Sequence, residues 1–320
     1  MADRRPSPIE RFWFFAPPGR VPDPTPADGP DPYGNPDPEW LRLDWREHLR
    51  TIDVGGAEVS YVEMGEPTGL DIVLVHGLSG SWQNWLENIP HLARRHRVLA
   101  LDLPGFGASP MPPWDITIER YGRLLVEFCD AAGADKAAVI GNSMGGFVSA
   151  EAAIKAPGRF DRVSLVSAAG VSHSRMRREP AEMAGRFATA ASPLVLRFQE
   201  RGLLRPGIRH WAFRMLFHYP TRIRRELIWE FFMNGAGTPG FLPAIGGLMG
   251  YDILDRLEEV EIPALVVWGR NDRIVAPADA LEYADRLGNS RLVVFDKTGH
   301  VPMAERPIRF NRLLEAFLAE

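Results

Sequence analysis

A serine between closely spaced glycines is the first group in this sequence that could do chemistry. Ser143 stands in Gly141-Asn-Ser-Met-Gly-Gly146, after the apolar run Ala137–Ile140 and before the helix-like stretch Gly145–Lys155. A sharp turn between a strand and a helix exposes a serine Oγ above a sheet edge, and small neighbours let the backbone turn so tightly. No Gly-x-Gly-x-x-Gly is present there and no Lys follows, which disfavours a phosphate-binding turn. We therefore predict that Ser143 is a nucleophile.

A serine hydroxyl needs a base, and the base needs a carboxylate that orients it. His300 follows the last predicted strand, Arg291–Phe295, and Asp272 follows the strand predicted at Ala264–Trp268. Loops at the carboxyl ends of parallel strands open at one edge of a sheet, so we expect the three side chains to meet there. The chain order of nucleophile, acid and base is that of a known catalytic triad on such sheets. The sequence thus predicts Ser143 as nucleophile, His300 as base and Asp272 as its orienting acid.

Short apolar runs alternate with helix-length amphipathic stretches from residue 51 onward. Besides the three runs already named, strands are predicted at Glu58–Val62, Ile72–Val75, Val98–Asp102 and Val163–Ser167. Besides Gly145–Lys155, helices are predicted at Trp82–Arg94, Ile116–Ala132, Pro277–Leu287 and Pro307–Leu318. This alternation indicates an α/β fold with a mostly parallel sheet covered on both faces.

Two segments depart from the alternation. Residues 1–50 form a proline-rich arm, in which 11 of the 28 prolines fall before residue 41, so residues 17–38 are expected to be extended. The aromatic cluster Phe12–Phe15 is expected to dock on the body of the same or a neighbouring subunit. Residues 171–250 are too long for a simple loop and lack strand patterns, which predicts a helical insertion. The insertion holds twelve Arg, no Lys and five Glu, a net +7 in a chain whose total is −4.

Composition excludes several classes of protein and site. A net charge of −4 disfavours a generic nucleic-acid binder, and the single cysteine, Cys129, excludes an internal disulfide or a multi-cysteine metal site. No run approaches the ~18–20 apolar residues of a membrane span, and the charged start lacks a secretory signal core. We therefore expect a cytoplasmic monomer or homodimer that acts on a small molecule, with no cofactor, metal or nucleic-acid partner.

The sequence resembles the α/β-hydrolase superfamily. The matching stretches lie after predicted strands: His76-Gly77-Leu78-Ser79-Gly80, Asp102-Leu-Pro-Gly-Phe-Gly-Ala-Ser109, Gly141–Gly146, Gly269–Val275 and Gly299–Pro302. The resemblance implies a mostly parallel eight-stranded sheet flanked by helices. It assigns residues 51–170 and 251–320 to the core and residues 171–250 to a helical lid inserted after the sixth strand.

The same resemblance implies roles for individual residues. The backbone N–H groups of Leu78 and Met144 would form the oxyanion hole, and His76 would be a structural residue of its turn. Epoxide hydrolases and haloalkane dehalogenases of the superfamily carry Asp where this chain has Ser143, which favours an acyl-enzyme. In the lid, Trp211, Phe217, Trp229 and Phe232 are expected to line an apolar substrate pocket.

Several substrates fit these residues. Our main expectation is a serine hydrolase of carboxylic esters with a moderately apolar acyl or alcohol part. The alternative is a carbon–carbon bond hydrolase of vinylogous diketone acids, because Gly-Asn-Ser-Met-Gly-Gly also resembles the elbow of those enzymes and an inward-turned lid Arg would bind a carboxylate. The turn Gly77-Leu-Ser-Gly-Ser81 lacks their longer Gly/Pro-rich form. Acyl transfer, perhydrolysis, lyase chemistry and a ligand receptor with a vestigial triad stay open.

Overall fold

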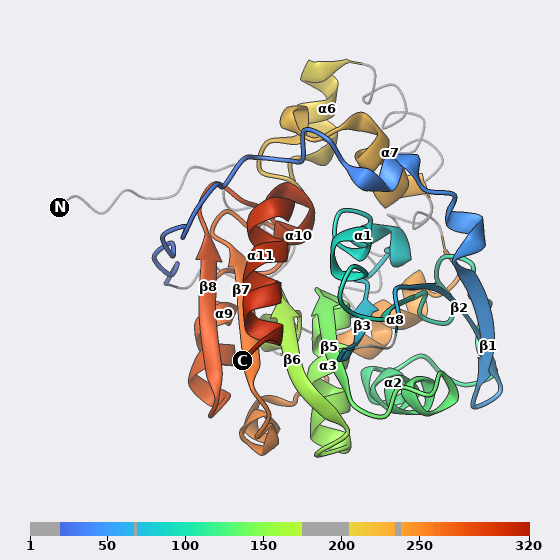
Figure 1. Cartoon of the computed structure of the whole chain (residues 1–320). Coiled ribbons are helices and arrows are strands. Elements are labelled where there is room, and N and C mark those ends of the chain that lie inside the picture. The colour runs from blue at the N-terminus through green and yellow to red at the C-terminus, as the bar shows by residue number, and fades with distance from the viewer. Residues whose placement is uncertain (1–19, 67–68, 175–204, 234–237) are drawn as a thin grey trace.

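Eight strands form one sheet in the order β1-β2-β4-β3-β5-β6-β7-β8 (Figure 1). The computed structural model describes residues 20–66, 69–174, 205–233 and 238–320. The strands are β1 (Leu49–Val54), β2 (Ala57–Met64), β3 (Asp71–Val75), β4 (Val98–Leu101), β5 (Ala137–Asn142), β6 (Phe160–Val166), β7 (Ala264–Gly269) and β8 (Ser290–Phe295). β2 pairs antiparallel with β1 and β4, and every other pair is parallel. The predicted α/β fold with a mostly parallel eight-stranded sheet is confirmed.

Helices cover both faces of the sheet. They are α1 (Ile89–Leu92), α2 (Ile118–Ala131), α3 (Met144–Lys155), α9 (Asp279–Arg286), α10 (Pro302–Glu305) and α11 (Pro307–Leu318), together with the 3₁₀ turns η2 (Glu39–Arg42), η3 (Trp45–Glu47), η4 (Trp82–Trp85) and η6 (Leu254–Glu259). Neighbouring strand residues face opposite sides, so Val139 packs in the core beneath α2 and α3 whereas Ile140 packs in the core beneath η4 and α11. Strands covered on both faces read as continuous apolar runs, which explains why β3 to β7 were visible in the sequence.

Two elements differ from the sequence-based expectation. The helix predicted at Trp82–Arg94 is instead the turn η4 followed by the one-turn helix α1, because Pro90 lacks an N–H group and fits only the first turn of a helix. Strand β1 was not predicted at all. It starts at Leu49, inside the segment assigned to the arm, and its mostly exposed residues show no buried stripe.

The described part of the arm contains no helix or strand before Glu39 and lies against the body. Thr25 N–H donates to the Val294 carbonyl of β8 at 2.8 Å, and Val294 N–H donates to Thr25 Oγ1 at 3.0 Å. Farther along, Gly34 N–H donates to the Glu305 carbonyl at 2.7 Å. The arm therefore follows the edge of the sheet and then crosses α10, as the blue trace in Figure 1 shows. The cluster Phe12–Phe15 lies outside the described residues.

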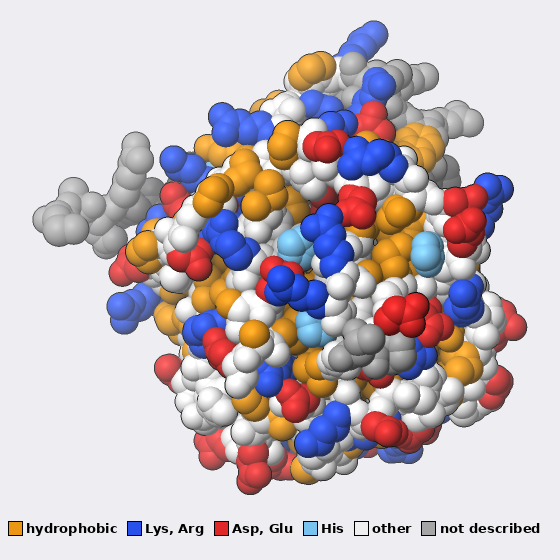
Figure 2. All heavy atoms as spheres, in the orientation of Figure 1, with side chains coloured by type: hydrophobic (Ala, Val, Ile, Leu, Met, Phe, Trp, Pro, Cys, Tyr) orange, Lys and Arg blue, Asp and Glu red, His pale blue; other side chains and the backbone are white. Residues whose placement is uncertain are grey.

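Every regular element described in the insertion between β6 and η6 is a helix. Its elements are α4 (Val171–Ser174), α6 (Pro206–Phe213), η5 (Pro220–Arg222), α7 (Arg225–Met233) and α8 (Phe241–Leu248). Figure 1 shows α6 and α7 above the carboxyl ends of β5 to β8, and Figure 2 shows many basic side chains on this upper part of the molecule. In the described ranges, no helix is both long and apolar enough to cross a membrane.

Candidate active site

Ser143 occupies a strained turn between β5 and α3. Its φ of 58° lies in the left-handed region, which is costly for a residue with a side chain. Ser143 N–H donates to the Val166 carbonyl at 2.9 Å, and the Ser143 carbonyl accepts from Ala169 N–H at 3.0 Å. These bonds to the end of β6 hold the turn in its strained conformation.

Glycines are required on both sides of this serine. A Cβ at Gly141 would lie 2.2 Å from the Gly145 carbonyl oxygen, and a Cβ at Gly145 would lie 2.3 Å from the Val75 carbonyl oxygen. Both distances are too short for a Cβ atom, so neither position can hold a residue with a side chain. The Gly-x-Ser-x-Gly pattern is thus explained by the packing of β5, α3 and the end of β3.

His300 and Asp272 form a buried pair beside this turn. His300 Nδ1 lies 2.8 Å from Asp272 Oδ2, and both side chains are almost completely shielded from solvent. Asp272 Oδ1 accepts from the N–H groups of Ile274 and Val275 at 2.8 and 3.0 Å. The carboxylate is therefore fixed by the backbone on one oxygen and presents the other to the imidazole, which favours the tautomer with the proton on Nδ1 and leaves Nε2 free to accept one.

Asn142, the residue before the serine, connects the nucleophile turn to the histidine loop. Its Nδ2 donates to the Val166 carbonyl at 3.0 Å and to the His300 carbonyl at 3.2 Å. Asn142 was not among the residues for which a role was predicted. The structure thus brings the three predicted residues to one edge of the sheet, after β5, β7 and β8.

The turn after β3 passes next to Ser143. A Cβ at Gly77 would lie 2.9 Å from Ser143 Cβ and 3.4 Å from Ser143 Oγ, so Leu78 follows at a position beside the hydroxyl. Met144 is the first residue of α3, where backbone N–H groups point out of the helix and carry partial positive charge. The two residues predicted for the oxyanion hole are therefore on segments that adjoin Ser143.

His76 links this turn to the loop after β4. Its Nδ1 lies 2.7 Å from the Gly77 carbonyl, and its Nε2 accepts from Leu103 N–H at 2.9 Å. Complete burial lowers the pKa of His76 to about 4, so the ring is neutral at pH 7.

Asp102 lies in the same loop after β4. Its carboxylate accepts from the N–H groups of Trp82 and Ala108 at 2.7 and 2.8 Å, and burial raises its pKa to about 6. Both residues join backbone segments, which agrees with the structural role predicted for His76.

The aromatic residues predicted to line a pocket differ in their exposure to solvent. Trp211 is 67% exposed and Trp229 is 40% exposed. Phe217 is buried and packs on Phe231 with ring centroids 5.7 Å apart. The side chain of Phe232 lies outside the described residues. Aromatic residues at helical spacing thus serve in part the insertion's own core, which sequence spacing could not distinguish from a pocket.

Two arginines beside Asp272 have no acidic partner among the residues that the structure describes. Arg273 is half-buried, and burial together with the nearby Arg214 lowers its pKa. In the described ranges, neither guanidinium has a carboxylate within 4.0 Å. Burial and the nearby Arg273 likewise lower the pKa of His218. Among the described residues, Arg214 of the insertion and Arg273 therefore place two positive charges near each other, beside Asp272.

A buried carboxyl that the sequence analysis missed lies on α10, five residues after His300. Glu305 is 0% exposed, and its oxygens accept from Gly299 N–H, from His218 N–H and from the Tyr33 hydroxyl. Burial raises the pKa of Glu305 to about 8, against these three hydrogen bonds, which favour the charged form. A charged residue inside the apolar segment Val301-Pro-Met-Ala-Glu305 was the only sequence signal for it.

A family model matches most of the chain. Residues 72–307, about three quarters of the chain, match the family model described as alpha/beta hydrolase fold. The chain belongs to the α/β-hydrolase fold family. Within the described residues of this hydrolase, no three His, Cys, Asp or Glu side chains are grouped as metal ligands.

Individual relatives of the hydrolase carry several activities. A 2-hydroxy-6-oxo-6-phenylhexa-2,4-dienoate hydrolase of Comamonas testosteroni is 30% identical over 283 residues, covering 84% of this chain and 93% of the relative. The solved structure of a hydrolase of the same name from Rhodococcus sp. strain RHA1 has a TM-score of 0.68 at 26% identity, with 85% and 98% of the chains covered. A thermophilic esterase from Thermogutta terrifontis has a TM-score of 0.69 at 26% identity, with the same coverage.

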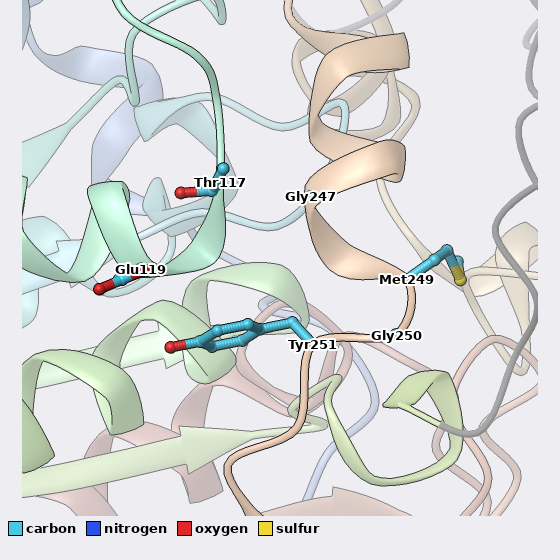
Figure 3. A pocket seen from close by; sticks show the side chains of 6 residues that line it. All are labelled: Thr117, Glu119, Gly247, Met249, Gly250 and Tyr251. Atoms are coloured by element: carbon cyan, nitrogen blue, oxygen red, sulfur yellow. The ribbon is translucent and has the colours of Figure 1, made fainter.

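One cavity of the hydrolase lies away from these residues. It encloses about 470 Å³ between the start of α2 and the end of α8 and is lined by Thr117, Glu119, Gly247, Met249, Gly250 and Tyr251 (Figure 3). Figure 3 shows the side chain of Met249 pointing to the opposite side from that of Tyr251. The Tyr251 hydroxyl is hydrogen-bonded to the buried Glu151. None of the residues predicted for catalysis lines this cavity.

Proposed function

We propose that the protein is a serine hydrolase whose nucleophile, base and orienting acid are Ser143, His300 and Asp272. The observation that carries the proposal is the buried 2.8 Å contact between His300 and Asp272, beside a serine held at positive φ. Ser143 Oγ adds to a substrate carbonyl carbon while its proton passes to His300 Nε2. Asp272 stabilises the imidazolium that forms, because its carboxylate accepts a hydrogen bond from the Nδ1–H group throughout.

The addition places negative charge on the former carbonyl oxygen. The Leu78 and Met144 N–H groups adjoin Ser143 and would donate to that oxygen. Loss of one such donor typically lowers kcat by about 10²–10³. The intermediate then expels its leaving group, which takes the proton from His300. Water, deprotonated by the same His300, releases the acyl group from Ser143 as a carboxylic acid and completes the cycle.

For the substrate class we favour carbon–carbon bond hydrolysis of a keto acid over our first expectation of ester hydrolysis. Two observations support this choice. One is the similarity to the dienoate hydrolase of Comamonas testosteroni. The other is the proximity of Arg214 and Arg273 beside Asp272, where neither has a carboxylate partner among the described residues, so that both suit a substrate carboxylate. The bond that breaks joins the acyl carbon to a carbon conjugated with a second carbonyl group. That carbon leaves as an enolate and takes up the proton, so water is the only co-substrate.

Ester hydrolysis is the second candidate. It uses the same addition and the same two amide donors, with an alcohol in place of the carbon leaving group. The likeness to the Thermogutta terrifontis esterase supports it.

Covalent labelling tests the nucleophile. A fluorophosphonate probe should modify the wild-type protein at one site, and Ser143→Ala should lose both the labelling and all turnover. The matched control is Ser79→Ala, a serine of the neighbouring turn after β3 whose φ is also positive but whose side chain has no assigned part in the chemistry. A wild-type protein that stays unlabelled, and inert towards keto acids and nitrophenyl esters alike, would contradict the proposal.

Replacement of Arg273 distinguishes the two substrate classes. We expect Arg273→Gln to raise KM for a coloured dienol-keto acid by about tenfold or more, because a charge-assisted hydrogen bond contributes about 1.5–3 kcal/mol. KM for a neutral nitrophenyl ester should change by less than about twofold, as should both values in the exposed control Arg225→Gln. A wild-type kcat/KM that is higher for the ester than for the keto acid would favour the second candidate.

A further inference from the structure

Three segments far apart in the sequence meet at the carboxyl group of Glu305. They are the arm near Tyr33, the insertion near His218, and the loop that carries His300. Figure 1 shows the arm passing between α6 of the insertion and α10, which ends at Glu305. A fully buried acidic group without a buried cation beside it is costly, so its hydrogen bonds determine whether it is tolerated.

The two carboxyl oxygens of Glu305 accept hydrogen bonds from different segments. Glu305 Oε1 accepts from Gly299 N–H, the residue before His300, at 2.7 Å. Glu305 Oε2 accepts from His218 N–H at 2.7 Å and from the Tyr33 hydroxyl. The Tyr33 oxygen in turn accepts from Tyr219 N–H at 2.7 Å. A continuous chain of hydrogen bonds therefore runs from the insertion through the arm to the backbone at the catalytic histidine.

The histidine loop has little room to move between these partners. His300 N–H donates to the Leu216 carbonyl at 2.9 Å, and a Cβ at Gly299 would lie 2.6 Å from that same oxygen. On the opposite side, the Thr298 carbonyl accepts from Asn271 N–H at 2.9 Å, next to Asp272. A displacement of Gly299 would thus be passed directly to the His300–Asp272 contact.

Tyr33 is itself fixed from several directions. The Arg306 guanidinium lies 4.8 Å from its ring centroid, and the Tyr219 ring meets it edge-on at 5.4 Å. Gly34 N–H donates to the Glu305 carbonyl, and Arg306 Nη1 donates to the Asp31 carbonyl at 2.9 Å. The hydroxyl is therefore held at Glu305 by the course of the arm.

We propose that Tyr33 and Glu305 are positioning residues for His300, so that arm residues 31–35 support the active site from outside the hydrolase core. The inference rests on the proposed function, in which His300 is the base. Loss of the Tyr33 hydroxyl leaves Glu305 Oε2 with one donor fewer in a site closed to water. The carboxyl then shifts to recover a partner and carries Gly299 and His300 with it. Displacements of about 1 Å at a reacting group can cost up to about 10²-fold in rate.

The test compares two Tyr→Phe substitutions that each remove a hydroxyl bonded to a buried carboxyl. Tyr33→Phe should lower kcat by about tenfold and leave KM within about twofold, because binding does not require the base to be aligned. Tyr251→Phe removes the hydroxyl bonded to Glu151, away from the histidine loop, and should leave both constants within about twofold. Thermal unfolding of both variants shows whether their losses of stability are comparable. Glu305→Gln should lower kcat further, because in either orientation its NH2 group would face a backbone N–H donor, that of Gly299 or that of His218.

A second readout does not depend on turnover. The proton between His300 Nδ1 and Asp272 should give a low-field proton NMR resonance that shifts or broadens in Tyr33→Phe and is unchanged in Tyr251→Phe. An unchanged kcat and an unchanged resonance in Tyr33→Phe would overturn the inference, as would equal losses of kcat in the two variants. If the wild type is neither labelled nor active, the proposed function fails, and the resonance alone then decides whether the arm positions His300.

Discussion

At the scale of single residues, Ser143 depends on the absence of side chains around it. Besides the hydrogen bonds to the end of β6, its turn requires the backbones of β5, α3 and the end of β3 to approach one another more closely than any Cβ would allow. The same approach brings Ser143 Oγ next to Gly77 and hence next to the Leu78 amide. Strain at the serine and its location beside the proposed oxyanion hole therefore have one cause.

Gly145→Ala tests this dependence. Its Cβ would lie 2.3 Å from the Val75 carbonyl and 2.5 Å from the His76 carbonyl, so α3 must move away from the turn after β3. We expect the free energy of unfolding to fall by about 2–3 kcal/mol and kcat to fall with it. The control Gly207→Ala places its Cβ in open space on α6 and should leave stability unchanged or slightly higher. Urea unfolding measures both, and equal stabilities for the two variants would contradict this account of the elbow.

At the scale of elements, the neutral ring of His76 joins the turn after β3 to the loop after β4. The unfolded chain binds a proton at this residue near its usual pKa of 6.5, whereas the folded chain binds it only near 4. Between these values the unfolded state holds more protons, so stability rises with pH and is lost as the pH falls from 6.5 towards 4. Asp102, with its raised pKa, contributes the opposite slope between 3.8 and about 6.

His76→Asn removes the titrating ring and keeps a donor near the Gly77 carbonyl. Between pH 6.5 and pH 5, the wild type should lose about 2 kcal/mol more of its free energy of unfolding than the variant does. Because both proteins retain Asp102, its opposite contribution cancels in the comparison. Urea unfolding across this range measures the difference. Parallel slopes for the two proteins would show that His76 does not titrate on unfolding.

At the scale of the whole molecule, the sequence predicted what depends on pattern and missed what depends on tertiary contact. Seven strands were visible because apolar runs covered on both faces need no partner to be recognised, whereas β1 is mostly exposed and shows no such run. The three residues proposed as nucleophile, base and acid were recognisable by their positions after strands. Glu305 and Tyr33 could not be recognised in the same way. They are 272 positions apart in the sequence, and only the folded chain brings the carboxyl and the hydroxyl into contact.

The orientation of side chains in the insertion could not be predicted from the sequence either. Its aromatic residues have the same helical spacing whether they face a substrate, a core or solvent, and the structure finds Phe217 buried but Trp211 and Trp229 exposed. The net charge of the insertion indicated more about the site than the spacing of its aromatic residues did. The excess of Arg counted in the sequence includes Arg214, which lies near Arg273 beside Asp272. Among the described residues, Arg214 has no acidic partner.

The bonds between Thr25 and Val294 have a consequence that concerns neighbouring molecules rather than catalysis. β8 is the last strand of the sheet, and its Val293-Val294-Phe295 segment would otherwise present unpaired N–H and C=O groups to any passing strand. An open edge of this kind is a template for aggregation, and proteins commonly cover it with a loop or interrupt it with proline. Pro22, Pro24 and Pro26 cannot donate backbone hydrogen bonds to a further strand, so the arm covers this edge without extending the sheet.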